Sequence, residues 1–466
     1  MATQRFGRRT ADTAEYSMVP RVVPADWQGT LEIWGDYEHT RLEPGTTYTY
    51  SLRSMKWNAG SSRKKAAVDG VASPDARGVL SVPFNPDFSG EWQVEINFEE
   101  ATRRSYHLPA TLGAYVRSRE EFNLKPYLGE LHSHSDQSDG MQTPVYCPIR
   151  AREFGYDFYT LTDHRNYRPS LRVLEAAPLV LGDSMLLLPG EEVHPESEAV
   201  ENGPFAHYVY HLTAIGHSES VRDLYLVDIE GSRAEVATIV AELERKGVVD
   251  GLDVWAYAES VWKARKVREL GGILLFPHPY WPWPSNLDEA AREQTFLDRE
   301  YDAVEVITPV DTSNVMPNRW AGDAASGNAY PVVGVADCHN WGPEVRMNTC
   351  TYVLAEELSA DAVLDAIRAG RSLAYETDGR GRLVGPWELI DFAEFYLLRL
   401  WPLKKRIMSM QAAIAFENLR TVSAPDAFEP GWEVAAAEHA DPALTTMARR
   451  LDDELRTLET RLWAAV

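Results

Sequence analysis

The chain has 466 residues, with 46 lysines and arginines against 70 aspartates and glutamates, which gives a formal net charge of -24. This length leaves room for two or three domains. An acidic chain of this kind disfavours nucleic-acid polyanions, because no run of basic residues offers them a local channel. We therefore expect a small-molecule substrate and no nucleic-acid partner.

Three cysteines, Cys147, Cys338 and Cys350, show no CxxC pairing and do not predict a disulfide framework. No apolar stretch is long enough to span a bilayer. The arginines near the N-terminus are not followed by the apolar stretch of a secretory signal. We expect a cytoplasmic protein with no membrane partner.

Residues 1–25 resemble a polar arm, and residues 26–111 carry β-strand signals. Partly alternating apolar residues at 31–34, 46–52, 79–84 and 91–98 are separated by turn residues. This pattern predicts an antiparallel β-sandwich that serves as an accessory domain.

The central part of the chain alternates apolar runs with helical stretches. Five runs end in residues that can bind metal ions: 128–131 before His132 and His134, 158–162 before Asp163 and His164, 185–188 before Glu191 and Glu192, 273–276 before His278, and 332–336 before Asp337 and His339. Because residues two apart in a strand share a face, the first two histidines project together. Strands alternating with helices predict a parallel sheet or barrel whose functional residues gather at the strands' carboxyl ends.

The C-terminal part, residues 377–466, is predicted to be mostly helical. An apolar stripe with 3–4 spacing comprises Met447, Leu451, Leu455, Leu458 and Leu462. The stripe packs back on the preceding domain or pairs with a second copy of the chain, which would make a homo-oligomer.

The ordered set of motifs resembles the PHP (polymerase and histidinol phosphatase) superfamily. The motifs are HxHxxxSDG at 132–140, TDH at 162–164, GxE at 190–192, PHP at 277–279 and DxH at 337–339. A β-rich segment before the first motif and the AIRAGR segment at 366–371 are similar to the carbaryl-hydrolase-like branch. The resemblance implies an α/β fold, with a distorted TIM-like β/α barrel over residues 112–376.

The resemblance further implies two or three divalent transition metals, with zinc, manganese or iron suited to imidazole and carboxylate ligands. His132, His134, Glu192 and Asp337 would bind the first metal, Glu192 with His278 and His211 the second, and Asp139, His164 and His339 the third. A metal-bridged hydroxide would be the nucleophile. Glu192, Asp337 and His278 would be the catalytic ligands, and Asp163 would orient the site through hydrogen bonds.

Several assignments have alternatives. The GxE form favours Glu192 over Glu191, which is then a supporting or exposed group. The mid-chain ligand is His207, His211 or His217, and His211 is preferred because an apolar run follows it. His194 is expected to be an ordinary surface histidine.

The substrate is less constrained by the sequence. Arg165 follows His164 and offers a cation for a phosphate. Tyr280, Trp281 and Trp283 follow His278 and favour a flat apolar group, unless they only pack their loop. A metal-dependent hydrolase of a small phosphoester, or of an aryl ester, carbamate or amide, is therefore expected. The alternatives are a catalytically inactive binding or regulatory protein and a nuclease acting on oligonucleotides.

Overall fold

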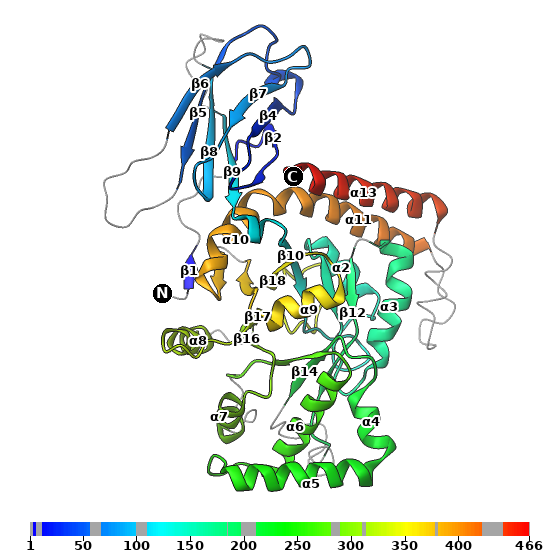
Figure 1. Ribbon diagram of the computed structural model, residues 1–466. Coiled ribbons are helices and arrows are strands. Elements are labelled where there is room, and N and C mark those ends of the chain that lie inside the picture. The colour runs from blue at the N-terminus through cyan, green and yellow to red at the C-terminus, as the bar shows by residue number, and fades with distance from the viewer. Residues whose placement is uncertain are drawn as a thin grey trace. The chain divides into compact units, whose positions relative to one another are not determined.

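The computed structural model describes residues 3–5, 12–55, 67–98, 110–183, 185–196, 211–280, 289–309, 314–377, 381–421 and 441–465. The fold is mixed α/β, and the chain divides into two compact units (Figure 1). Unit 1 comprises residues 1–6, 126–390 and 405–452. Unit 2 comprises residues 7–125, 391–404 and 453–466.

Unit 2 contains two sheets, as the alternation of its sequence predicts. A three-stranded antiparallel sheet has the order β2 (Tyr16–Val19), β4 (Gly29–Gly35), β7 (Leu80–Phe84). A five-stranded sheet has the order β3 (Val22–Pro24), β9 (Ala110–Arg117), β8 (Gly90–Asn97), β5 (Tyr48–Ser54), β6 (Ala67–Ala72). The short helices are η1 (Glu38–Thr40) and α1 (Arg119–Phe122). The packing of the two sheets as a sandwich stays a prediction.

Two boundaries of the predicted domains differ from the structure. Residues 1–25 are not only a polar arm, because β2 and β3 lie there and β1 (Thr3–Arg5) pairs with a strand of unit 1. The β-rich segment does not end at residue 111, since β9 continues the sheet to Arg117 with almost every residue buried. The strands within residues 1–25 are three or four residues long, and β1 and β3 pair with strands far away in the sequence.

Unit 1 contains a seven-stranded and a five-stranded sheet. The first has the order β1, β20 (Arg382–Val384), β19 (Ser372–Glu376), β18 (Thr349–Ala355), β10 (Lys125–Glu130), β11 (Phe158–Thr160), β12 (Leu186–Leu188). The second has the order β13 (Gly190–Val193), β14 (Leu212–Ile215), β15 (Ile273–Phe276), β16 (Ala303–Ile307), β17 (Val332–Gly334).

The two sheets of unit 1 are joined where the predicted ligands lie. Parallel backbone bridges pair Ser133 with Cys338 and His164 with Glu192. The five expected strands are therefore present and their ends meet. Pairing is parallel for β10–β11–β12 and β15–β16–β17, but β14 is antiparallel to both of its neighbours. A closed TIM-like barrel stays a prediction.

Helices flank these strands in unit 1, as the alternation of apolar runs with helical stretches predicts. They are α2 (Tyr146–Glu153), α3 (Arg168–Leu181), α4 (Val221–Val227), α5 (Ile229–Lys246), α6 (Val254–Glu269), α7 (Glu289–Asp298), α8 (Val315–Ala325) and α9 (Ala360–Arg368). Figure 1 shows α5 lying across the ends of α4 and α6. These three helices bury an apolar cluster that includes Tyr225, Val236 and Trp262.

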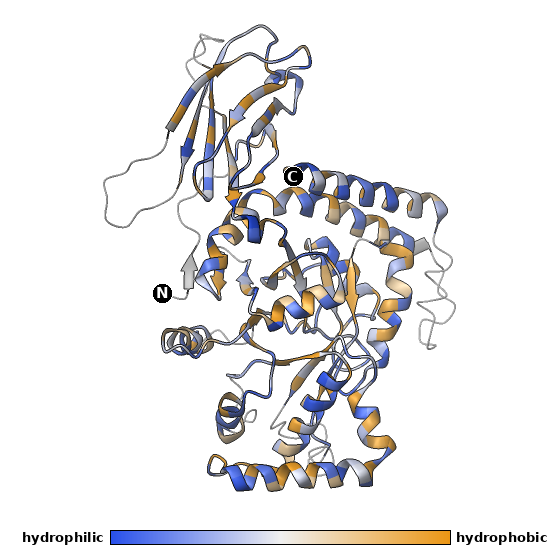
Figure 2. Ribbon diagram, viewed as in Figure 1, coloured by the Kyte–Doolittle hydropathy of each residue, from blue (hydrophilic) through white to orange (hydrophobic). Residues whose placement is uncertain are grey.

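The C-terminal helices are α10 (Trp387–Arg399), α11 (Trp401–Thr421) and α13 (Pro442–Leu462). In Figure 2, hydrophilic and hydrophobic residues alternate along α13, as the stripe predicts. Arg152 of α2 donates to Gln411 of α11 at 3.0 Å, and Gln411 donates to Asp452 of α13. Buried polar contacts thus join α11 and α13 to α2 within unit 1, while Met447 stays 49% exposed.

None of the helices among the described residues combines the length and apolarity that a membrane crossing needs.

Candidate metal centre

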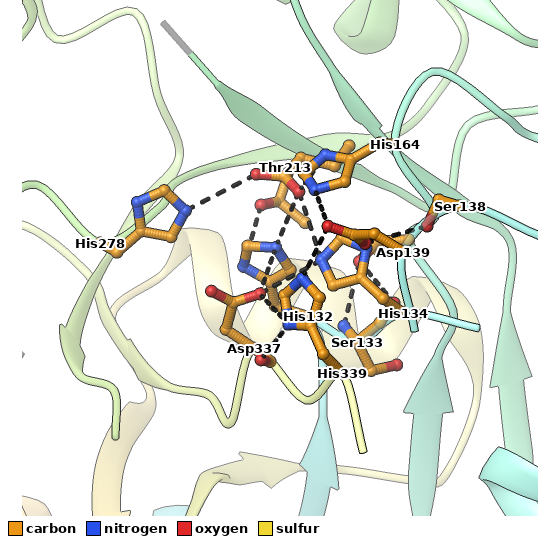
Figure 3. A network of polar contacts seen from close by, with 12 residues as sticks. His132, Ser133, His134, Ser138, Asp139, His164, Thr213, His278, Asp337 and His339 are labelled. Atoms are coloured by element: carbon orange, nitrogen blue, oxygen red, sulfur yellow. Dashed lines mark hydrogen bonds and ion pairs between the residues drawn. The ribbon is translucent and has the colours of Figure 1, made fainter. Parts of the chain in front are cut away.

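His132 and His134 follow β10 and are fully buried, with their ring centroids 5.2 Å apart. Both Nε2 atoms face the same two carboxylates. They lie 3.2 and 3.3 Å from Glu192 Oε2, and 3.4 and 3.2 Å from Asp337 Oδ1. The prediction that the two imidazoles project together is confirmed, and Figure 3 shows them facing Asp337.

Glu192 is the centre of the cluster. Its carboxylate lies within 3.6 Å of ring nitrogens from five histidines, namely His132, His134, His164, His211 and His278. The carboxylate is buried, since β13 enters the cluster from the edge of the five-stranded sheet. A single anionic group shared by so many nitrogen ligands has the arrangement of a bridging carboxylate.

Asp139 brings together a second group of imidazoles at the open side of the cluster. Its Oδ2 lies 3.4 Å from His164 Nε2 and 3.3 Å from His339 Nε2, while Oδ1 lies 3.7 Å from His134 Nδ1. The Asp139 side chain is 53% exposed, whereas His134 is buried. The Asp139 and His339 end of the cluster is therefore accessible to solvent, with His339 35% exposed.

Three residues at this centre have left-handed backbone conformations without being glycine. The φ angles are 24° for His278, 46° for Asp337 and 52° for Arg165. Such angles are costly for side-chain-bearing residues and concentrate at functional sites. His278 and Asp337 are predicted ligands, and the Arg165 N–H donates to the Glu192 carbonyl at 2.9 Å.

A layer of buried carboxylates supports the ligands. Asp163 accepts hydrogen bonds from the Ser135 N–H at 2.7 Å and the Ser138 hydroxyl at 2.6 Å, and so holds the loop that carries Asp139. Glu130 accepts from the backbone N–H groups of His132 and Ala336 at 3.0 Å each. Glu130 was not predicted as a functional residue, although a carboxylate at the end of an apolar strand was a usable signal.

The pKa shifts in the cluster show that its buried carboxylates require positive charge nearby. Burial lowers the pKa of His164, but Glu192 and Asp139 raise it to about 10. Burial raises the pKa of Glu192, yet His164, His132 and His211 hold it well below its usual range. Burial lowers the pKa of His211 to about 4. Protons on some imidazoles thus balance the carboxylates, and a divalent cation would replace these protons.

The donor set fits metal ions. Four sets of side chains each present ligand atoms within 4.8 Å of one another: His134, Asp139, His164 and His339; His164, Glu192, His194 and His211; His132, Glu192 and His278; and His132, His134 and Asp337. His132 Nε2, His134 Nδ1 and Glu192 Oε2 are buried and make no hydrogen bond to the described residues. Atoms of this kind, left without hydrogen bonds in a dry site, suit a cation. All nine predicted ligands belong to these sets.

The expectation for His194 is wrong. This histidine is 2% exposed, its Nε2 lies 2.9 Å from His164 Nδ1, and its ring centroid lies 4.0 Å from that of His211. Burial and the neighbouring His211, His164 and Arg165 lower its pKa well below the usual range. β13 ends at Val193, so the chain turns the His194 ring back into the cluster.

The structure also bears on the alternatives for the bridging glutamate and for the mid-chain histidine. Glu191 is not exposed but buried, and it accepts from the Val221 N–H at 2.7 Å and the Ser220 hydroxyl at 3.1 Å. His217 lies 3.4 Å from Glu191 and belongs to none of the metal-ligand sets of the described residues, whereas His211 does. His207 lies outside the described residues.

The predicted substrate residues are only partly described. Tyr280 accepts a hydrogen bond from Arg319 at 2.8 Å, and the Arg292 guanidinium lies 4.6 Å from its ring centroid. Tyr280 also packs against the apolar cluster of β16 and α8. Trp281 and Trp283 lie outside the described residues.

No family model matches the chain, and no curated protein matches it. Among solved structures, a Bacteroides vulgatus two-domain protein with a predicted PHP-like metal-dependent phosphoesterase is 18% identical, covering 58% of this chain and 71% of that one, with a TM-score of 0.39. A Chromobacterium violaceum amidohydrolase with bound sulfate and no metal is 18% identical, covering 53% and 97%, with a TM-score of 0.33. Endonuclease Q with a 27-mer duplex bearing an abasic lesion is 15% identical, covering 53% and 57%, with a TM-score of 0.32. TM-scores below 0.5 do not by themselves define this chain's fold or function.

Replacing Glu192 by Gln is expected to abolish most metal loading, because an amide cannot offer charge to several ions. Glu191→Gln is the matched control on the same strand. It should load metal normally but lower the free energy of unfolding by about 1 kcal/mol or more, since the Val221 and Ser220 donors lose a charged acceptor. Elemental analysis and thermal melts of both variants test this. Equal metal loss in both would contradict the assignment.

Metal binding should release protons. His164 has a pKa of about 10 without metal, so it is protonated at neutral pH, and a ligand imidazole must be neutral. Affinity for Mn²⁺ should therefore rise as the pH increases from about 6.5 to about 8. Calorimetry in two buffers of different ionisation enthalpy measures the protons released. An affinity independent of pH with no proton release would contradict the assignment of His164 as a ligand.

Proposed function

We propose that this chain is a metal-dependent hydrolase of the PHP type that cleaves a small phosphoester, or an aryl ester, carbamate or amide. The observation that carries the proposal is the buried Glu192 carboxylate within 3.6 Å of five histidines. Asp337 adds a second buried carboxylate beside two of them. A protein that needed this cluster only for stability would gain little from so many buried ionisable groups.

The residues divide into a buried end and an open end. His132, His134, Glu192 and Asp337 would hold ions where water is excluded, and Asp139 and His339 would hold one at the solvent-accessible end. Divalent zinc, manganese or iron ions in such sites activate water and polarise the bond to be cleaved. The side chains themselves fix the ligand geometry, and Glu192 joins the two ends.

Substrate would enter at the open end. The side chains of Asp139, His339 and His164 are 53%, 35% and 25% exposed, while Glu192 is 1% exposed. Arg165 follows His164 directly, and its charge acts on His194 inside the cluster. This cation would attract an anionic or polarised substrate oxygen.

The net charge of -24 favours a small substrate over an oligonucleotide. A DNA duplex, the partner of endonuclease Q in its solved complex, is the counter-substrate that separates a small-molecule hydrolase from a nuclease.

Metal-loaded protein should hydrolyse p-nitrophenyl phosphate or an aryl ester or carbamate, and activity should vanish on chelation and return with Mn²⁺ or Zn²⁺. His339→Ala at the open end should lower kcat/KM by about a hundredfold or more, because it removes a ligand imidazole. His39→Ala, which removes an exposed histidine paired with Glu15, is the control and should retain most activity. Release of p-nitrophenol is the assay.

Full metal loading without turnover of any of these substrates would contradict the hydrolase proposal and favour a binding or regulatory protein. Turnover of the DNA duplex alone would favour a nuclease.

A further inference from the structure

Glu305 is a carboxylate in the middle of an otherwise apolar strand. β16 has the sequence Ala-Val-Glu-Val-Ile, and all five residues are buried. The Glu305 side chain has no exposed surface. A carboxylate in such a place is costly unless its oxygens accept strong hydrogen bonds, so the contacts of Glu305 indicate why it is there.

One oxygen of Glu305 contacts a predicted metal ligand. Oε1 lies 2.8 Å from His132 Nδ1. The other ring nitrogen, Nε2, faces Glu192 Oε2 at 3.2 Å and Asp337 Oδ1 at 3.4 Å. Because a carboxylate can only accept, this contact places a proton on Nδ1 and leaves the Nε2 lone pair directed into the metal cluster.

The other oxygen fixes a second predicted ligand. Oε2 accepts a hydrogen bond from the backbone N–H of His278 at 2.9 Å. His278 has a φ of 24°, a strained conformation that needs support from its surroundings. β15, which leads to His278, pairs in parallel with β16, so Glu305 reaches across the sheet to the end of the neighbouring strand.

We propose that Glu305 is a positioning residue of the metal centre: one carboxylate sets the tautomer of His132 and holds the backbone of His278. These two imidazoles meet at Glu192, at 3.2 and 3.6 Å. The inference rests on the proposed metal-dependent function and extends it to a residue that binds no metal itself. Thr213 Oγ1 lies 3.5 Å from the same Nδ1 and, as a hydroxyl, adapts to either tautomer, so Glu305 determines the choice.

Two variants test whether Glu305 acts through its two hydrogen bonds or only by filling space. Glu305→Gln keeps the volume of the side chain but turns one acceptor into an NH₂ donor, which must face either the His132 Nδ1–H or the His278 N–H. Glu305→Ala removes both acceptors. Glu259→Gln is the matched control, because Glu259 is equally buried and accepts from Tyr225 at 2.7 Å and Trp255 at 3.1 Å.

The experiment titrates metal-free wild type and each variant with Zn²⁺ by calorimetry, and records the proton spectrum of the zinc-loaded proteins labelled with ¹⁵N-histidine. Glu305→Gln and Glu305→Ala should bind Zn²⁺ about 10- to 100-fold more weakly, as expected when the partner of a ligand histidine is lost. The downfield His132 Nδ1–H signal of the wild type should shift in Glu305→Gln and disappear in Glu305→Ala. Glu259→Gln should match the wild type in both measurements.

Unchanged zinc affinity and an unchanged Nδ1–H signal in Glu305→Gln would overturn the positioning role. If the wild type itself binds no zinc, the proposed function fails, and this outcome is distinct because it appears before any variant is compared. If Glu305→Ala does not fold, the nearly isosteric Glu305→Gln decides the question. A loss of affinity in Glu259→Gln equal to that in Glu305→Gln would also overturn the proposal, since it would show a general effect of removing a buried carboxylate.

Discussion

The arrangement of unit 1 depends on the burial of the Glu192 carboxylate among five imidazoles. A buried anion needs a compensating positive charge. The five imidazoles provide it either by carrying protons or by binding a divalent metal ion together with the carboxylate. The pKa of His164 shifts upward and that of Glu192 downward for this reason. The same charge imbalance that costs stability in the metal-free protein makes the cluster a strong ligand set for metal ions.

Backbone pairing between strands brings the charged ligand side chains together. Bridges from Ser133 to Cys338 and from His164 to Glu192 join the two sheets at the strand ends that carry the ligands. The His134 N–H donates to the Cys338 carbonyl at 2.9 Å, and the Thr162 N–H donates to the Ser133 carbonyl at 2.9 Å. Ligands from distant parts of the sequence are thus held by main-chain hydrogen bonds, while Asp139 stays on a more exposed loop.

Much of the site was predictable because its ligands stand at the ends of apolar runs. Strand ends alone indicated that His132 and His134 project together, and the family resemblance implied their grouping with Asp337. The choice of His211 over His217 agrees with their positions. The burial of His194 in the cluster could not be predicted, because the hydrophobic periodicity of the sequence does not indicate that the chain turns back after β13. Glu305 was not predicted, because its partners lie 173 residues away in one case and 27 in the other.

Fold prediction failed where pairing is non-local. The strands within residues 1–25 are three or four residues long, and β1 and β3 pair with β20 and β9, which are distant in the sequence, so local patterns gave them no weight. The antiparallel β14 could not be distinguished from a parallel strand, because both are short buried apolar runs. Helices such as α5 and α6 are easier to predict, because the spacing of their apolar residues is contained in one continuous stretch of sequence.

The central claim is that the imidazoles and carboxylates around Glu192 are metal ligands. Elemental analysis of protein purified without chelators and supplemented with Zn²⁺, Mn²⁺ or Fe²⁺ tests it most directly. The nine predicted ligands, together with His194, form overlapping sets that predict two or three ions per chain. Protein that retains at most one ion per chain after supplementation would contradict the multinuclear centre, and protein that retains none would contradict the account as a whole.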